Sequence, residues 1–268
     1  MMRKSKQGSL PNLATRVALT ICAMRNNRRN RGLELGVLLL VSELFNTGFG
    51  VIPPVTLGTI IGQTLLYLGI IQVPWDRWDV CISAQNVWRN QDWKRLILSA
   101  VEHGDDRHLY YNMISFLSKA RSLEPRYGSL NFAILLTIIT TLTSGIYVAL
   151  GLSCANVLHD AYYLQTCAIG FSGVVFALKV ITTMENNYYT QTTIAGFTMP
   201  SKYAPWAELI LIHLLVPNAS FMGHLAGILA GLMYTSTPIG SIIDSIIRTI
   251  TGRGMWHEWT ARSYYRRY

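Results

Sequence analysis

The stretch ASFMGHLAGILAGLMYTS at residues 219–236 is almost entirely apolar and carries a glycine at every fourth position from Gly223 to Gly231. A second apolar stretch, CAIGFSGVVFALKVITTM at residues 167–184, has glycines on both sides of the pair Phe171-Ser172. Runs of this length approach the span of a bilayer. Small residues four apart form one stripe of a helix and allow close packing. We therefore predict that the two stretches are helices of one membrane bundle.

The composition of the whole chain agrees with a membrane protein. Half of the 268 residues are hydrophobic and only 14% are charged, whereas a soluble domain has about a quarter of its residues charged. Further apolar runs cover residues 53–71, 107–122, 130–152 and 203–217. We predict an all-α polytopic membrane protein with six transmembrane helices, the first of which begins at Pro53 and Pro54. Residues 33–50 contain Glu34 and Glu43, so they either lie along the interface, re-enter the membrane or form a seventh span.

Charged residues divide the chain into three parts. Residues 1–32 contain eight Lys or Arg and no acid, which predicts a basic cytoplasmic extension, with a targeting segment over 1–23 as the alternative. Residues 33–240 are the predicted membrane domain, and residues 241–268 a short basic cytoplasmic tail. Because basic flanks mark the cytoplasmic side, the net charge of +9 indicates topology, and we expect no nucleic-acid partner. The Trp-rich residues 72–106 are predicted to fold onto the membrane as a long first loop.

Four polar residues stand near the beginnings of predicted spans. His108 and Asn112 begin the second span, Ser172 the fourth and His224 the sixth, and these three spans run in the same direction. A helix rises about 1.5 Å per residue, so residues four or five positions inside lie on the order of 6–8 Å deep. We therefore expect all four side chains at one level, near one face of the membrane.

Such a set of side chains is suited to hydrolysing a peptide bond. Ser172 can attack a carbonyl carbon, and His224 can take its proton and return it to the leaving amine. No carboxylate is placed to orient His224, so we predict a Ser-His dyad. His108 and Asn112 are four apart on one helix face and are candidate donors for the developing oxyanion. The structural alternatives are a serine bonded back to its own helix and glycines that serve packing alone.

The other polar residues indicate neither a metal nor a cofactor. Residues 102–106 hold acids and a histidine but lack the spacing of a zinc helix, so we expect no metal site and no cofactor. The four cysteines show no CxxC spacing, and a disulfide between Cys154 and Cys167 would close one exposed loop. Lys179 is expected to extend its amine toward the cytoplasmic interface. Glu208 and His213 lie on different faces of their helix and are not an evident pair.

Taken together, these motifs resemble those of the rhomboid family of intramembrane serine proteases. The matching segments are GFSG at 170–173, GHLAG at 223–227, HLYYN at 108–112, LEPRYG at 123–128 and the Trp-containing loop before the second span. The resemblance implies a six-helix core, a Ser-His dyad and an oxyanion site at His108 and Asn112. It also implies that Glu124 and Arg126 are structural and support the first loop.

The segments IPPVT at 52–56, DWKRL at 92–96 and WAEL at 206–209 are similar to the branch of the family found in the endoplasmic reticulum. That resemblance implies cleavage of transmembrane or membrane-anchored proteins in the ER membrane, in quality control, with ER-associated degradation factors as partners. The mitochondrial inner membrane is the alternative location. A Derlin-type pseudoprotease, which binds and moves clients without cutting them, is the alternative function. A transporter is a third class, but it predicts a site at the midplane of the membrane.

Overall fold

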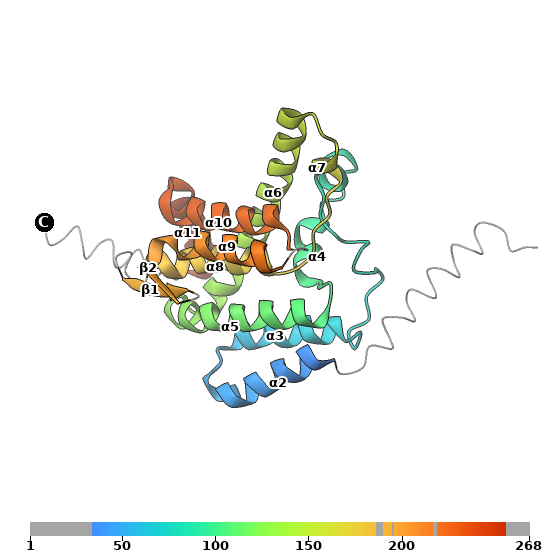
Figure 1. The fold of residues 1–268 in the computed structure, drawn as a ribbon. Helices are drawn as coiled ribbons and strands as arrows, with labels where there is room; N and C mark the ends of the chain where they lie inside the picture. Colours follow the sequence, from blue (N-terminus) through green and yellow to red (C-terminus); the bar gives the residue numbers. More distant parts are fainter. Residues whose placement is uncertain (1–33, 186–189, 195, 217–218, 256–268) are drawn as a thin grey trace, which may run out of the picture.

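The computed structural model describes residues 34–185, 190–194, 196–216 and 219–255 and is mostly helical (Figure 1). Its long helices are α2 (Leu35–Thr47), α3 (Pro54–Tyr67), α5 (Asp106–Tyr127), α6 (Ser129–Leu158), α8 (Ser172–Glu185), α9 (Ala204–Leu215), α10 (Phe221–Ser236) and α11 (Pro238–Thr251). Shorter elements are the helical turns η1 (Phe49–Val51), η2 (Gln85–Arg89) and η3 (Ser201–Tyr203), the helices α4 (Arg95–Val101) and α7 (Tyr162–Gln165), and a hairpin of β1 (Gln191–Ile194) and β2 (Phe197–Pro200).

The apolar runs of the sequence coincide with α3, α5, α6, α8, α9 and α10. Local chemistry explains where several of these helices begin. Pro54 occupies the first turn of α3, where its missing amide hydrogen costs nothing. The side chain of Asp105 accepts a hydrogen bond from the His108 amide at 2.8 Å, and Ser220 accepts one from the Gly223 amide at 3.1 Å. Both are N-caps, which satisfy amides that the helix itself leaves free.

Fewer of the described helices are long and apolar enough to cross a membrane than the six that the sequence predicts. Among the described helices, α6 is long and apolar enough to cross a membrane, and α10 with α11 adds a second candidate if the two are one span bent by 78°. The helix α2 is shorter but also apolar. The count of six spans therefore stays a prediction, as do the assignments of residues 33–50 and of the membrane domain's limits.

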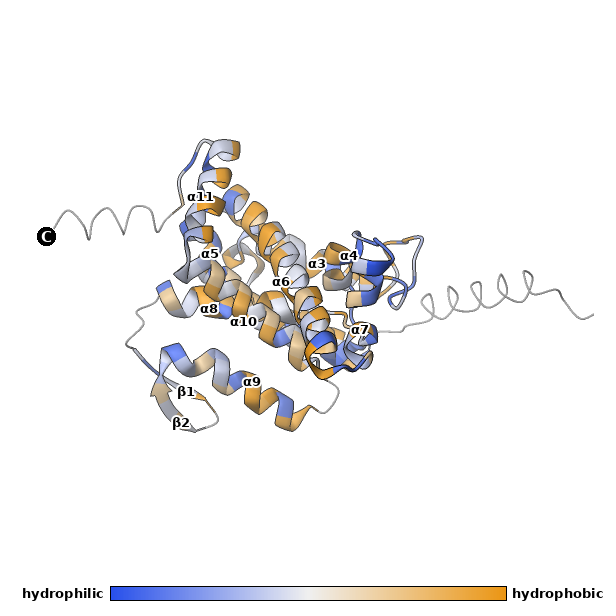
Figure 2. Cartoon of the chain, turned by 90° about the horizontal axis from the view of Figure 1, so that it is seen from above, coloured by the Kyte–Doolittle hydropathy of each residue, from blue (hydrophilic) through white to orange (hydrophobic). Residues whose placement is uncertain are grey.

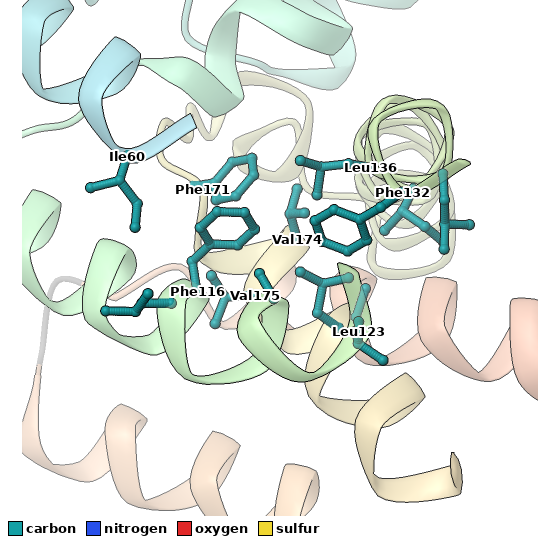
Figure 3. Packing of buried hydrophobic residues seen from close by; sticks show 14 of the residues in the cluster. Ile60, Phe116, Leu123, Phe132, Leu136, Phe171, Val174 and Val175 are labelled. Carbon is teal, nitrogen blue, oxygen red and sulfur yellow. The ribbon is translucent and has the colours of Figure 1, made fainter. Parts of the chain in front are cut away.

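Apolar side chains lie both inside and outside the bundle. Inside, Phe116 of α5 meets Phe171 edge to face, with ring centroids 5.2 Å apart, and side chains of α3, α6 and α8 pack around them (Figure 3). Outside, large apolar residues remain exposed, including Leu35, Phe45, Ile210, Leu214 and Leu215. Figure 2 shows such hydrophobic residues on α9, at the edge of the bundle. Exposed apolar surface on this scale is unusual for a soluble monomer.

Two elements differ from the sequence predictions. Residues 241–251, predicted as part of a basic tail, belong to α11, whose Ile243 and Ile247 are buried against the bundle. The connection between α8 and α9 contains the antiparallel hairpin, because β-branched residues flank a turn in which Gly196 has a φ of 85°. Residues 1–33, which include the predicted basic extension, and residues 256–268 of the predicted tail lie outside the described part of the chain.

Glu124 and Arg126 connect the end of α5 to two other helices. The buried Glu124 carboxylate accepts hydrogen bonds from the Val55 amide at 2.9 Å and from the Thr56 amide and hydroxyl at 2.7 Å each. Arg126 lies 3.5 Å from the Glu185 carboxylate at the end of α8. Glu124 thus ties the end of α5 to the start of α3 and not to the first loop, and Arg126 ties it to the end of α8. The expected support of the first loop by Arg126 stays a prediction.

We expect Glu124→Gln to lower the free energy of unfolding by about 1–3 kcal/mol. The carboxylate accepts hydrogen bonds at both of its oxygens, whereas the glutamine side chain has one acceptor oxygen and an NH2 group that can only donate. Thermal unfolding of the purified protein in detergent measures this change. Glu43→Gln is the matched control, since Glu43 has no hydrogen bond to the described residues through its side chain. Equal unfolding midpoints for the two variants would contradict the role of Glu124.

Candidate functional site

The N-terminal ends of α5, α8 and α10 meet at one place. A Cβ atom added to Gly170, just before α8, would lie 2.7 Å from His108 Nε2 and 3.6 Å from Asn112 Nδ2, both on α5. A Cβ atom on Gly173 would lie 2.9 Å from the Gly223 carbonyl oxygen, on α10. The structure therefore brings His108 and Asn112 to Gly170, two residues before Ser172, and brings Gly173 to Gly223, the neighbour of His224; the predicted site formed by these four residues stays a prediction.

Glycines bring α8 and α10 into backbone contact. A Cβ atom on Gly227 would lie 2.0 Å from the carbonyl oxygen of Gly173, and one on Gly231 would lie 2.7 Å from that of Ala177. Side chains do not fit at such distances, so the glycine stripe of α10 serves the close approach that its spacing predicts. The contact places the first turn of α8, with Ser172, beside the first turn of α10, with His224.

Ser172 is the first residue of α8 and not, as predicted, a residue inside a longer helix. The backbone before it is extended: Ala168 pairs with Ile82 in an antiparallel bridge, and Gly170 has a φ of 121°, which only glycine adopts readily. The change of direction at Gly170 prevents the helix from starting earlier. As a result, the half-buried Ser172 stands at a helix N-terminus, where free amide groups favour negative charge.

His224 is buried, and its ring stacks on Phe176 with centroids 4.7 Å apart and an interplanar angle of 27°. Its Nδ1 has no hydrogen-bond partner among the described residues. Both His224 and Ser172 are described, yet no hydrogen bond joins the Ser172 hydroxyl to the imidazole. The direct Ser-His contact thus stays a prediction, although the two residues begin touching helices.

His108 and Asn112 provide donors beside the segment that precedes Ser172. Asn112 is buried, and its Nδ2 has no partner among the described residues. Unsatisfied polar atoms are costly and gather at functional sites, and Asn112 and His224 each carry one among the described residues. His108 also packs edge to face on His103, with centroids 5.2 Å apart. Burial, and then the nearby His108, hold the pKa of His103 well below its usual range, so that ring stays neutral.

The first loop is fastened to the segment leading to Ser172. A disulfide joins Cys81 to Cys167, and Ile82 and Ala168 exchange hydrogen bonds of 2.8 and 3.0 Å. The Gly170 amide donates to the Ser99 carbonyl of α4 at 2.8 Å. The disulfide between Cys154 and Cys167 that the sequence left possible is not formed, because the first loop folds back over this segment and brings Cys81 to it, leaving Cys154 as a free thiol.

Breaking this disulfide should loosen the site. We expect Cys81→Ser to lower the free energy of unfolding by about 2–4 kcal/mol, because the cross-link restricts the unfolded chain. Peptide mapping without reduction first establishes the bond, and thermal unfolding with and without a reducing agent then measures its contribution. Cys154→Ser should leave the midpoint unchanged. An unfolding midpoint in the wild-type protein that does not respond to reduction would contradict this prediction.

Lys179 and Glu208 differ from their sequence predictions. The Lys179 amine forms an ion pair with the Glu208 carboxylate and so links α8 to α9, instead of extending toward the interface. Glu208 therefore has a partner that its own helix could not provide. Within the described part of the chain, no group of three or more His, Cys, Asp or Glu is arranged to hold a metal ion.

Sequence reasoning missed three parts of this site. Phe176 lies one helical turn after Ser172, a spacing that could have placed an aromatic ring beside the predicted Ser-His pair. Tyr147 of α6 donates a hydrogen bond to the Thr166 carbonyl at 3.0 Å and fixes the start of the extended segment. The carbonyl of Ser99 binds Gly170, and no sequence signal indicates that contact.

Comparison with known proteins assigns the family. Residues 90–240 match the model of the rhomboid domain. The chain is 44% identical to Rhomboid-related protein 4 of Rattus norvegicus, over 81% of this chain and 68% of that protein. It is 37% identical to Rhomboid-like protein 14, mitochondrial, of Arabidopsis thaliana, over 84% of this chain and 70% of that protein. The identity to Rhomboid-type serine protease 2 of Eremothecium gossypii is 30%, over 52% of this chain and 50% of the relative. No solved structure matches the chain.

The chain therefore belongs to the rhomboid family, whose members are generally embedded in membranes. Within that family, its similarity to Rhomboid-related protein 4 extends over most of its length, at 43% identity for the protein of Homo sapiens. Some relatives carry the name of serine proteases.

Proposed function

We propose that this protein is an intramembrane serine endopeptidase that cleaves transmembrane or membrane-anchored proteins. One observation carries the proposal: the first turns of three helices bring a serine, a buried histidine and two further polar side chains together, with unsatisfied atoms on His224 and Asn112. A bundle has no structural need for such atoms, since leaving them unpaired lowers its stability. Substrate groups can supply the missing partners.

The proposed mechanism uses Ser172 as the nucleophile. Its Oγ attacks the carbonyl carbon of the scissile bond, while His224 accepts the hydroxyl proton. The imidazolium then gives this proton to the leaving amine, and the peptide bond breaks to leave an acyl ester on Ser172. Water, activated by the same histidine, cleaves the ester and restores the serine. Because the Ser172 hydroxyl and His224 are not hydrogen-bonded in this structure, a side-chain rotation on substrate binding is part of the proposal.

His108, Asn112 and the first amides of α8 are the proposed oxyanion donors. The side chains of His108 and Asn112 lie beside Gly170, in the segment that leads to Ser172. Donors that are fixed before the reaction stabilise charge without reorganising during it. His108→Ala and Asn112→Ala should each lower kcat by about 10²–10³-fold while leaving residual cleavage. Kinetics with a purified single-span substrate measure this, and a loss confined to KM would contradict the assignment.

A pseudoprotease is the second candidate, and the missing Ser172–His224 hydrogen bond is the observation that favours it. A mechanism-based serine reagent distinguishes the two. If the protein is a protease, a fluorophosphonate or isocoumarin probe labels Ser172 in the reconstituted protein, and His224→Ala prevents the labelling. Intact protein that retains its fold, binds a client helix and stays unlabelled would support the pseudoprotease.

We further propose that the site faces an oxidising compartment. Disulfides persist in such compartments and are rare in the cytosol, and the Cys81–Cys167 bond lies on the same side of the bundle as Ser172. This supports an ER membrane with the site toward the lumen. The mitochondrial inner membrane, suggested by the name of the Arabidopsis relative, is the alternative. Imaging of the full-length protein with markers for both organelles decides between them.

A further inference from the structure

Helix α11 has three distinct faces. At roughly 100° per residue, Ile243, Asp244 and Ile247 fall on one side, and all of them are buried against the bundle. Next to this side runs a stripe of four isoleucines that the protein leaves uncovered, which we call the isoleucine stripe: Ile239, Ile242, Ile246 and Ile250. The exposed fractions reach 59% at Ile242 and 64% at Ile250. The rest of the circumference carries Ser241, Ser245, Arg248 and Thr249. The apolar arc of α11 is therefore wider than the surface of the bundle that it covers.

The angle between α10 and α11 is fixed by specific contacts. The two helices are bent by 78° at Thr237, whose hydroxyl caps α11. The Tyr234 hydroxyl donates to the buried Asp244 carboxylate at 2.9 Å. A Cβ atom on Gly240 would lie 1.9 Å from the Tyr234 carbonyl oxygen, so the first turn of α11 fits closely against the last turn of α10. These contacts hold the bend in one geometry.

Such a bend determines how α11 meets a bilayer. The 16 residues of α10 extend about 24 Å, most of a hydrocarbon core of about 30 Å, so its C-terminal end comes close to the boundary of that core if α10 crosses the membrane as proposed. A helix at 78° to it then runs nearly parallel to the membrane surface. The sequence after α11 is also rich in residues that prefer this boundary, with Trp256, Trp259, Tyr264 and several arginines.

We infer that α11 lies in the membrane surface, with the isoleucine stripe inserted among the lipids and the serine and threonine face turned to water. Amphipathic helices of this kind bury one apolar face at the boundary of headgroups and acyl chains. The lipid bilayer is the partner that the geometry favours, because the stripe is apolar and exposed and its helix follows α10, which is proposed to span the membrane, at 78°. The inference rests on the proposed membrane embedding and is independent of proteolytic activity.

Paired single-cysteine variants test the inference. In a background with Cys22→Ser and Cys154→Ser, which keeps the disulfide, Ile246→Cys places a label on the isoleucine stripe and Ser241→Cys places one on the polar face. Both positions are exposed in the protein itself, so only lipid distinguishes them. The variants carry an environment-sensitive fluorophore and are reconstituted in phosphatidylcholine vesicles that contain iodide on both sides or a lipid with a nitroxide near its headgroup.

We expect the label at residue 246 to be quenched at least twofold more strongly by the nitroxide lipid than the label at residue 241, and iodide to show the reverse order. Ile250→Cys and Ser245→Cys form a second pair in case one substitution disturbs the fold. Equal iodide quenching at both faces would place the stripe in water and overturn the inference. Protection of residue 246 from both quenchers would mean that protein covers it, such as a second copy of this chain, and would also overturn it. Alkaline carbonate extraction tests the membrane embedding separately.

Discussion

Replacing Ser172 or His224 by alanine should abolish cleavage of a single-span substrate, with a loss on the order of 10⁴-fold or more in kcat/KM. In the proposed mechanism the serine supplies the nucleophilic oxygen, and no other described hydroxyl stands at the first turn of α8. In the proposed mechanism the histidine supplies the base, and its ring is held by stacking on Phe176. Purified protein, reconstituted with substrate in one bilayer, provides the measurement.

The two losses should not add. Because nucleophile and base act in one step, removing the second after the first takes away nothing further, so the double variant should be as inactive as either single variant. Ser153→Ala and His159→Asn are matched controls on exposed residues of α6 and its C-terminal cap, and they should retain wild-type rates. Unchanged cleavage by both alanine variants at positions 172 and 224 would refute the assignment and would place the chemistry elsewhere in the chain.

Much of the helical arrangement can be predicted from the sequence because hydrophobic length and helix-start residues act locally. The run from residue 53, with its paired prolines, and the run from residue 219, with Ser220 before its glycines, begin as helices where these residues indicate. The meeting of α8 with α10 follows from the glycine stripe, since two helices with no side chains between them approach closely wherever lipid and packing permit.

Features that depend on tertiary contacts could not be predicted from the sequence. The partner of Cys167 is decided by where a long loop lies, and only the pairing of Ile82 with Ala168 brings Cys81 to it. The partners of Glu124 were not predicted for a similar reason. Its three hydrogen-bond donors belong to the start of α3, far from it in the sequence. The helix α11 was not predicted because Arg248 and the arginines that follow the helix indicated a basic tail, although its isoleucines recur at helical spacing.

For the candidate site, the sequence predicts which residues take part, but it does not predict the contacts between their side chains. Spacing and direction along the chain predict His108, Asn112, Ser172 and His224 at one end of the bundle, and the structure places His108 and Asn112 beside Gly170 and places Gly223 beside Gly173. Whether a hydroxyl touches an imidazole depends on one side-chain rotation and on shifts well below the width of a helix. Sequence patterns do not contain that information, and the proteolytic assignment therefore depends on kinetic and labelling experiments.

Gly227→Ala should damage both the fold and the site, because the added methyl group would lie 2.0 Å from the Gly173 carbonyl oxygen and 3.0 Å from its Cα. Backbone atoms cannot rotate away as a flexible side chain can, so α8 and α10 must separate. Overpacking of this kind costs about 1–3 kcal/mol and occasionally more, and we expect the upper end. Since Ser172 and His224 begin these two helices, a displacement of about 1 Å between them should also lower kcat by about 10²-fold.

The matched control for this substitution is Gly145→Ala in α6, where an added Cβ atom would have nothing within 4 Å. Alanine is favoured over glycine inside a helix by about 1 kcal/mol, so this variant should keep its activity and unfold at the same or a higher temperature. Unfolding midpoints in detergent and probe labelling of Ser172 give the two readouts. If Gly227→Ala kept both at wild-type values, α8 and α10 could not be in backbone contact, and the glycine stripe would no longer account for the position of the serine beside the histidine.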